Sequence, residues 1–288
     1  MAHKSPGVKA KALGTQLRVC REDAGLNMRD AAEAVDCDKS ALSRLETGSR
    51  RVSVEEVALL LGVYRVRGAL RDELLAAARS LDESGWWGWG QGLASLPKAM
   101  VTLAECESEA RRVTNWAPML VPGLLQTMYY ARAWLLATGT DRERVEMLLA
   151  ARATRQRILS TEGQEFIFFL GEPALFTSVG DAGVLATQLA RIRELGERRN
   201  VSIRVLPAGA GPHEGQLGSF VVMEFPATGP LVLVELMRSS VFLDDEVQTQ
   251  PYVAALSTLS TLALSEAESM RRITQVQAGL GLVSVPAG

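Results

Sequence analysis

The chain has 288 residues, 47% of them apolar, with 31 Lys and Arg against 33 Asp and Glu and a net charge of −2. This composition is typical of a globular protein and excludes a disordered or fibrous chain, and the length fits about two domains. No apolar run approaches the roughly 20 residues that span a bilayer, and the first residues lack the apolar segment of a signal peptide. We therefore expect a cytoplasmic protein with no membrane segment.

Cysteine and histidine are too scattered for a zinc site. The three cysteines are Cys20, Cys37 and Cys106, and the two histidines are His3 and His213. They lack the spacing of zinc ligands, and widely spaced thiols are typical of a reduced compartment. We expect neither a metal nor a cofactor.

Charge is divided unevenly along the chain. Residues 1–80 carry 14 basic and 11 acidic side chains, or +3, whereas the other 208 residues carry 17 and 22, or −5. A basic N-terminal segment followed by an acidic remainder favours a polyanion-binding domain joined to a domain that does not bind polyanions.

Two helices are predicted before residue 36. Apolar residues with helical spacing indicate the first, namely Leu13, Leu17, Cys20 and Ala24. Gly25 is placed to end it, and Asn27 to cap the next helix. The inward face of that second helix comprises Met28, Ala31, Ala32 and Val35.

A third helix follows a tight turn. Asp36 belongs to the few residue types other than glycine that tolerate a left-handed turn, and Asp38 can cap the helix behind it. Leu42 and Leu45 face the core, and Gly48 ends the helix. The opposite face is small, polar and basic: Lys39, Ser40, Ser43 and Arg44.

Two further helices complete this domain. Ser53 to Glu56 forms a capping box that opens the fourth helix, and residues 69–79 have the pattern of a fifth. A helix, a short turn and a second helix with a polar outer face form the layout of a helix-turn-helix. Lys and Arg pair with guanine in the major groove, and Ser can donate or accept. The pattern predicts that this domain binds double-stranded DNA.

The stretch LGTQLRVCREDAGLNMRDAAEAVDCDKSALSRLETGSRRVSVEEVALLL resembles the Xre/Cro-type helix-turn-helix, a five-helix domain related to lambda repressor. The resemblance implies base or phosphate contacts by Lys39, Ser40, Ser43 and Arg44. It implies backbone contacts by Arg18, Arg50 and Arg51. Asn27 and Met28 belong to the same predicted interface, although Met28 replaces the usual glutamine and Asp36 replaces the usual turn glycine.

SGWWGWGQG, residues 84–92, concentrates three of the five tryptophans among four glycines. Trp86 and Trp87 could stack on a ligand or on bases, or they could pin the first domain onto the second. We predict a linker at 81–97 between a DNA-binding domain at 1–80 and a second domain at 98–288.

The second domain is predicted to be α+β, with a small, mostly antiparallel sheet packed by helices. Helices are expected at 99–112, around Tyr129, Tyr130 and Trp134, behind a capping box at Thr140 to Glu143, and at 181–197. Another is expected from Asp244, interrupted near Pro251, and one more behind a capping box at Ser265 to Glu268. Strands are expected at 165–170, 201–206, 218–225 and 231–236, with an edge strand at 241–243. A loop is expected at 116–127.

One helix of this domain is rich in arginine: Arg142, Arg144, Arg152, Arg155 and Arg157. These side chains could bind phosphate. A charge run on a long helix, however, is usually a solvated face with ion pairs one turn apart.

Four motifs of the second half resemble the C-terminal domain of a large group of actinobacterial regulators that are called antitoxin-like. They are GWW, LVPGLLQT, VSIRVLP and GPHEGQLGSFVVMEFP. The resemblance implies no established catalytic role, a gene for a small partner protein nearby, and developmental or secondary-metabolite control.

Catalysis has little support in the sequence. His213-Glu214 lies in a Gly/Pro-rich loop, and Glu172 is a candidate second carboxylate, but no nucleophile elbow, phosphate loop or zinc-protease motif occurs. We expect no enzyme. Glu172, His213, Trp86 and Trp87 are instead the candidate site for a ligand or partner.

The sequence thus predicts a homodimeric transcription regulator whose second domain binds a small protein or a metabolite. The alternative is an antitoxin-like interaction module that sequesters a small partner and only autoregulates its operon.

Overall fold

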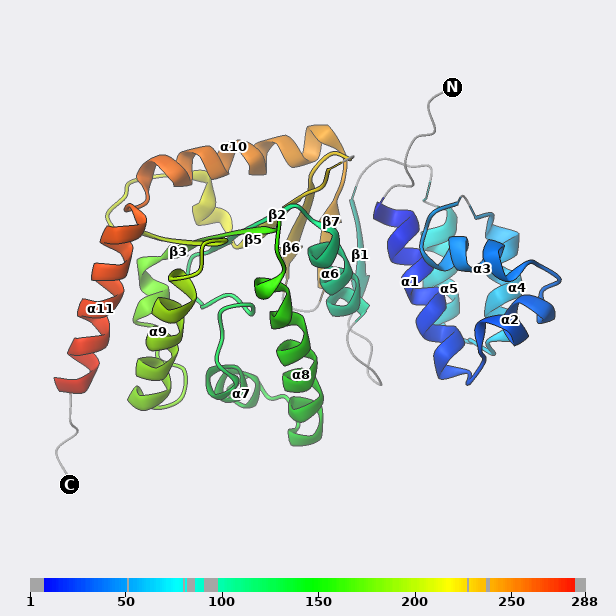
Figure 1. The fold of residues 1–288 in the computed structure, drawn as a ribbon, viewed down its shortest axis with the longest axis horizontal. Helices are drawn as coiled ribbons and strands as arrows, with labels where there is room; N and C mark the ends of the chain where they lie inside the picture. The colour runs from blue at the N-terminus through cyan, green and yellow to red at the C-terminus, as the bar shows by residue number, and fades with distance from the viewer. Residues whose placement is uncertain are drawn as a thin grey trace. The chain divides into compact units, whose positions relative to one another are not determined.

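The computed structural model describes residues 8–50, 52–79, 81, 86–90, 98–226, 228–236 and 239–282. The chain divides into two compact units. The first comprises Met1–Cys106, Ala227–Leu231 and Leu236–Gln248, and the second comprises Glu107–Pro226, Val232–Glu235 and Thr249–Gly288. Figure 1 shows the elements of each unit.

The five predicted helices of the first unit are present: α1 Val8–Asp23, α2 Met28–Ala34, α3 Lys39–Glu46, α4 Val54–Val63 and α5 Ala69–Arg79. Each contributes at least one fully buried apolar residue to a common core, among them Leu17, Ala31, Leu42, Leu61 and Leu74. Apolar spacing correctly predicted buried residues of α1 to α4, but Ala24, which was predicted on the apolar stripe of the first helix, lies beyond the end of α1 and is exposed.

The turn between α2 and α3 has the predicted left-handed residue. Asp36 has φ 52°, its N–H bonds to Glu33 O, and the N–H of Cys37 bonds to Ala32 O. These are the two bonds of a Schellman motif, which satisfies carbonyl groups at the end of α2. Asp38 is the N-cap of α3 as predicted, but its side chain makes no capping hydrogen bond, so the prediction was wrong on that contact.

α1 approaches the end of α3 closely because glycine stands at both contact points. A Cβ atom on Gly14 would lie 2.5 Å from the carbonyl oxygens of Leu45 and Glu46. One on Gly48, which ends α3 with φ 64°, would lie 2.5 Å from Lys11 Cα. The predicted capping box of Ser53 with Glu56 is confirmed at the start of α4.

The first unit also contains two strands. β1 Trp86–Gly90 pairs antiparallel with β7 Ser239–Leu243, with Trp86 opposite Leu243 and Gly90 opposite Ser239. No strand was predicted at residues 86–90. The partner strand lies some 150 residues later, so neighbouring residues do not indicate the pairing. The glycines of this segment also argue against a strand, because glycine is depleted in strands.

The second unit is built on a mixed sheet, and the predicted α+β class is confirmed. Its strands are β2 Arg112–Ala117, β3 Glu165–Gly171, β4 Val201–Leu206, β5 Phe220–Glu224 and β6 Leu231–Glu235. Their order is β6-β5-β2-β3-β4. β2 pairs antiparallel with β5 and parallel with β3, and β3 pairs parallel with β4.

β3 is buried on both faces. Phe166, Phe168, Phe169 and Leu170 are 0–4% exposed, although their side chains alternate between the two faces. A continuous apolar run is what a strand with parallel neighbours and covered faces requires. In Figure 1, α10 lies on one side of the sheet and α7, α8 and α9 on the other.

β2 corrects the prediction of a helix through Arg112. α6 Lys98–Glu109 ends earlier, because the side-chain amide of Gln164 donates to the carbonyl oxygens of Glu107 at 3.0 Å and Ala110 at 2.7 Å. Arg112 then bonds Glu165 on one neighbouring strand at 2.8 Å and Glu224 on the other at 3.3 Å. Partners more than 50 residues away fix this strand, and sequence periodicity does not reveal them.

The remaining helices are α7 Met128–Ala137, α8 Arg142–Arg155, α9 Ala182–Gly196, α10 Glu246–Leu262 and α11 Glu266–Leu282. Two predicted details were wrong. Asp141, rather than Thr140, caps α8, and α10 continues through Pro251, which lies near its start. The capping box of Ser265 with Glu268 is confirmed. Among the described residues, no helix is long and apolar enough to cross a membrane.

Candidate nucleic-acid interface

The two faces of α3 differ in burial and chemistry. Leu42 is fully buried and Leu45 is 3% exposed. Across the helix, Lys39, Ser40 and Arg44 are exposed and Ser43 is half-buried. Within the described part of the chain, no ion pair or side-chain hydrogen bond occupies these four residues. The outer face thus offers two cationic groups and two hydroxyls that the fold itself does not use.

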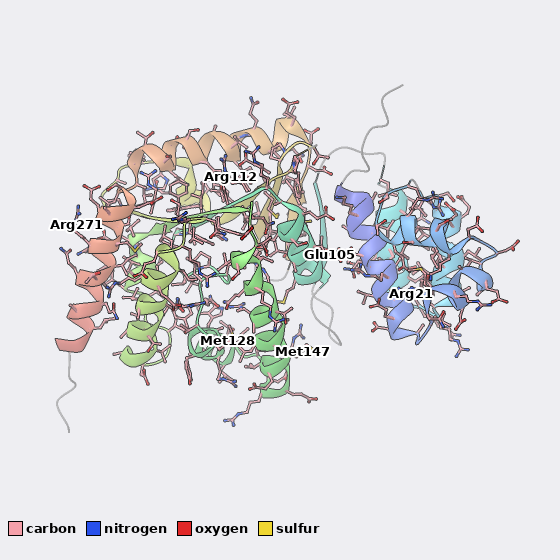
Figure 2. All side chains as sticks on the ribbon, in the orientation of Figure 1. Arg21, Glu105, Arg112, Met128, Met147 and Arg271 are labelled. Atoms are coloured by element: carbon pink, nitrogen blue, oxygen red, sulfur yellow. The ribbon has the colours of Figure 1, made fainter. Side chains whose placement is uncertain are left out.

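A buried ion pair holds α3 against α1. Arg21 donates from Nε to Glu46 Oε1 at 2.7 Å and from Nη2 to Oε2 at 2.9 Å. Its Nη1 donates to Leu26 O at 2.9 Å. The hydrogen bond to Glu46 raises the pKa of the Arg21 guanidinium, and Figure 2 shows this side chain within the helical domain.

The sequence analysis did not single out this pair, although a signal was present. Glu46 stands four residues after Leu42, on the core stripe of α3, and its side chain is 2% exposed. A carboxylate on a core stripe needs a charged partner, and Arg21 lies on the neighbouring helix.

Asn27 and Met28, which were predicted to contact DNA, lie at the start of α2. The Asn27 side chain accepts from the N–H of Arg29 at 2.9 Å and of Asp30 at 3.0 Å, and its amide donates to Asp30 Oδ2 at 2.7 Å. Met28 is half-buried. Asn27 therefore caps α2 as predicted, and its contact with DNA stays a prediction.

The arginines expected to contact the DNA backbone have different surroundings. Arg18 forms an ion pair with Glu105 of α6. Arg50 donates to Ala41 O at 3.1 Å and to Glu56 at 2.8 Å, which joins α3 to the capping box of α4. That bond is the main reason why the pKa of Glu56 lies below its ordinary value. Arg51 lies outside the described residues.

The candidate residues of the second domain meet at the loop between β4 and β5, because Glu172 contacts this loop and His213 lies in it. Glu172 accepts from Ala208 N–H at 2.9 Å and pairs with Arg272 at 2.6 Å. His213 packs edge-on against Trp116, with ring centroids 5.7 Å apart.

Trp116 anchors the middle of this loop by donating to Gly215 O at 2.7 Å. The sequence analysis placed Trp116 in a loop and missed this role. For Trp86 and Trp87 only the backbone, in β1, is described. No group of three or more His, Cys, Asp or Glu able to hold a metal ion occurs among the described residues.

Comparisons with known proteins agree with this architecture. Residues 12–74 match a family described as a helix-turn-helix domain. Residues 100–275 match a family described as a domain of unknown function, DUF5753. A structure of the clp gene regulator ClgR from C. glutamicum is 32% identical over 27% of this chain and 96% of that chain, with a TM-score of 0.22. No curated protein matches.

The helix-turn-helix fold, its exposed basic helix face and the matching family define a DNA-binding transcription regulator. The match to the DUF5753 family covers more than half of the chain, and the chain therefore belongs to this family.

Proposed function

We propose that the protein is a sequence-specific regulator that places α3 in the major groove of its operator. Lys39, Ser40, Ser43 and Arg44 contact base edges or phosphates, and Arg18, Asn27, Met28, Arg50 and Arg51 border the groove. Residues 1–80 form the DNA-binding domain, and residues 98–288, behind the linker at 81–97, form a sensing and dimerisation domain. The protein acts in the cytoplasm.

The observation that carries this proposal is the free outer face of α3. An eight-residue helix is about 12 Å long at 1.5 Å per residue, which is close to the width of the major groove. The ion pair of Arg21 with Glu46 fixes the opposite face. The helix can therefore enter the groove without rearranging its own domain.

Fluorescence anisotropy tests the proposal with the full chain, its own upstream DNA and a scrambled duplex over a salt series. Arg44→Ala should weaken specific binding by about 1–3 kcal/mol and relax specificity at one base pair. Arg79→Ala, which removes the same charge from the exposed end of α5, is the matched control and should change affinity little.

Equal binding to both duplexes that fades steeply with salt would mean phosphate contact alone. An equal loss for Arg44→Ala on both duplexes would make Arg44 a backbone contact.

Dimerisation through the second domain is part of the proposal. A dimer requires two half-sites whose centres lie one helical turn, about 34 Å, apart. Footprinting of the upstream DNA should show two protected segments with this spacing, and moving one of them by half a turn should abolish tight binding. A single protected segment would indicate a monomer.

The second domain is proposed to receive a signal from a small protein or a metabolite. The loop that holds His213 supports this, because it is anchored at both Ala208 and Gly215 and yet presents Leu217, which is 94% exposed. A fixed loop with an exposed apolar residue can serve as a contact for a partner.

The alternative is the antitoxin-like module that sequesters a small partner and only autoregulates. Under it, the full chain purified from its native cells carries a small protein that Leu217→Asp releases. Expression of that protein alone should then have an effect that the regulator suppresses. Regulation of many promoters with no such partner would exclude this alternative.

A further inference from the structure

Arg18, which is proposed to border the DNA groove, is held by a carboxylate of its own chain. Glu105 of α6 accepts from Arg18 Nη2 through one oxygen and from the Thr15 hydroxyl through the other. Both donors lie on α1, about one helical turn apart, and Glu105 belongs to the same compact unit, whose first segment ends at Cys106. A carboxylate with a donor on each oxygen is fixed in place.

The ion pair of Arg18 with Glu105 can nevertheless open. The Arg18 side chain is 39% exposed and that of Glu105 is 32% exposed. Ion pairs with this access to water add little to stability, because water and salt screen the two charges. Thr15 is only 3% exposed, and its hydroxyl loses this partner when Glu105 leaves. The contact is therefore favoured in the absence of DNA and is weak enough for DNA to displace.

A carboxylate on Arg18 occupies the position that a DNA phosphate needs. Both groups are anions that accept hydrogen bonds from a guanidinium in the same geometry. While Glu105 is bound, it cancels the charge of Arg18 and repels a phosphate that approaches. The contact thus lowers the affinity of α1 for the DNA backbone.

The position of Glu105 depends on the second domain, because α6 continues into it. Glu107 is the first residue of the second compact unit, and its side chain is 0% exposed. Arg155 of α8 donates to Glu107 from Nε at 2.5 Å and from Nη2 at 2.6 Å. Two residues along a helix span about 3 Å, so a shift of α6 at this anchor moves Glu105 by a similar amount.

This anchor corrects the expectation that the arginine-rich helix α8 presents a solvated charged face. The Arg155 side chain is 12% exposed and forms a bidentate pair with Glu107. The Nε and Nη1 atoms of Arg152 are inaccessible to solvent and make no hydrogen bond. The expectation was wrong at these two positions, whereas Arg142 is exposed.

We propose that Glu105 competes with DNA for Arg18 and keeps this arginine off the phosphate backbone in the absence of a signal. The inference rests on the proposed function, because it regulates one of the backbone contacts assigned there. A change in the second domain that shifts α6 withdraws Glu105 and releases Arg18. Helix α6 is then the element through which the second domain controls the affinity for DNA.

Fluorescence anisotropy of the full chain with its upstream DNA over a salt series tests the competition. Glu105→Gln keeps the size of the side chain and removes the competing charge. It should tighten binding about two- to fivefold, the factor that corresponds to an exposed ion pair. Because Arg18 then gains a phosphate, the slope of log K against log salt should become steeper by about 0.9. A role of Glu105 in folding alone would not change this slope.

Three further variants assign the effect to Arg18. Arg18→Ala alone should bind nearly as well as the wild type, since Glu105 already withholds this arginine. When Arg18→Ala is combined with Glu105→Gln, the gain in affinity and the steeper slope should both disappear. Glu109→Gln, which removes the same charge from the exposed end of α6, is the matched control and should change affinity little.

An unchanged or weaker affinity for Glu105→Gln overturns the proposal, and so does a gain that persists without Arg18. A gain of the same size in Glu109→Gln also overturns it, because net charge alone then explains the effect. Thermal unfolding without DNA shows whether Glu105→Gln is folded, and Glu105→Ala takes its place if it is not. These outcomes leave operator recognition by α3 intact, whereas a loss of preference for the upstream DNA in every variant and the wild type refutes the proposed function itself.

Discussion

The ion pair between Arg21 and Glu46 should be required for the position of α3. The two side chains are 7% and 2% exposed, and they share two hydrogen bonds of 2.7 and 2.9 Å. Replacing one partner leaves the other charge buried and unpaired, which costs about 3–5 kcal/mol. Replacing both with apolar residues of similar size removes both the desolvation penalty and the attraction between the charges. The free energy of unfolding should then stay nearly unchanged.

Hydrogen exchange of the full chain, followed by mass spectrometry, measures this locally. In Glu46→Leu and in Arg21→Met, amides of α3 should exchange faster by about two to three and a half orders of magnitude, at 1.4 kcal/mol for each factor of ten. The double variant should return close to wild type, with a large coupling energy. If Glu46→Leu alone exchanges like the wild type, the pair does not hold α3 and the argument fails.

Three further predictions concern the same domain. Gly14→Ala should weaken operator binding and lower the thermal midpoint, because its Cβ atom would lie 2.5 Å from two backbone carbonyl oxygens at the end of α3. Gly62→Ala, in open space on α4, is its control and should stabilise by about 0.5–1 kcal/mol; equal midpoints for the two variants would contradict the close approach. Ser53→Ala should cost about 1 kcal/mol in urea unfolding through the lost cap of α4, and an unchanged midpoint would speak against that cap. Glu56→Gln should lower the thermal midpoint more at pH 7 than at pH 3, because the bond from Arg50 lowers the pKa of Glu56. Its stabilisation is then present above the ordinary carboxyl pKa and is lost as the pH falls through the lowered pKa. An equal difference at both pH values would exclude the charge as its cause.

The first domain could be predicted almost completely because its information is local. Helix spacing, the cap Asn27, the left-handed residue Asp36 and the capping box at Ser53 each act within a few residues. Their effects do not depend on distant parts of the chain. The outer face of α3 follows directly, since the buried leucines determine which side chains point away.

The second domain could be predicted only where the pattern was strong. β3 and β4 are apolar or alternating runs, and both were identified. β2 contains Arg112, Thr114 and Asn115, and its identity as a strand depends on β3 and β5, which arrive from far along the chain.

By itself, the sequence determined the five helices of the DNA-binding domain, the residues of α3 that face outward, and the α+β class of the second domain. These follow from periodicity and capping, which are properties of neighbouring residues. Tertiary structure alone decided which charges are exposed. Arg152 and Arg155 belong to the same run as Arg142 and have the same chemistry, but packing around α8 withdraws two of them from water and leaves one without a partner.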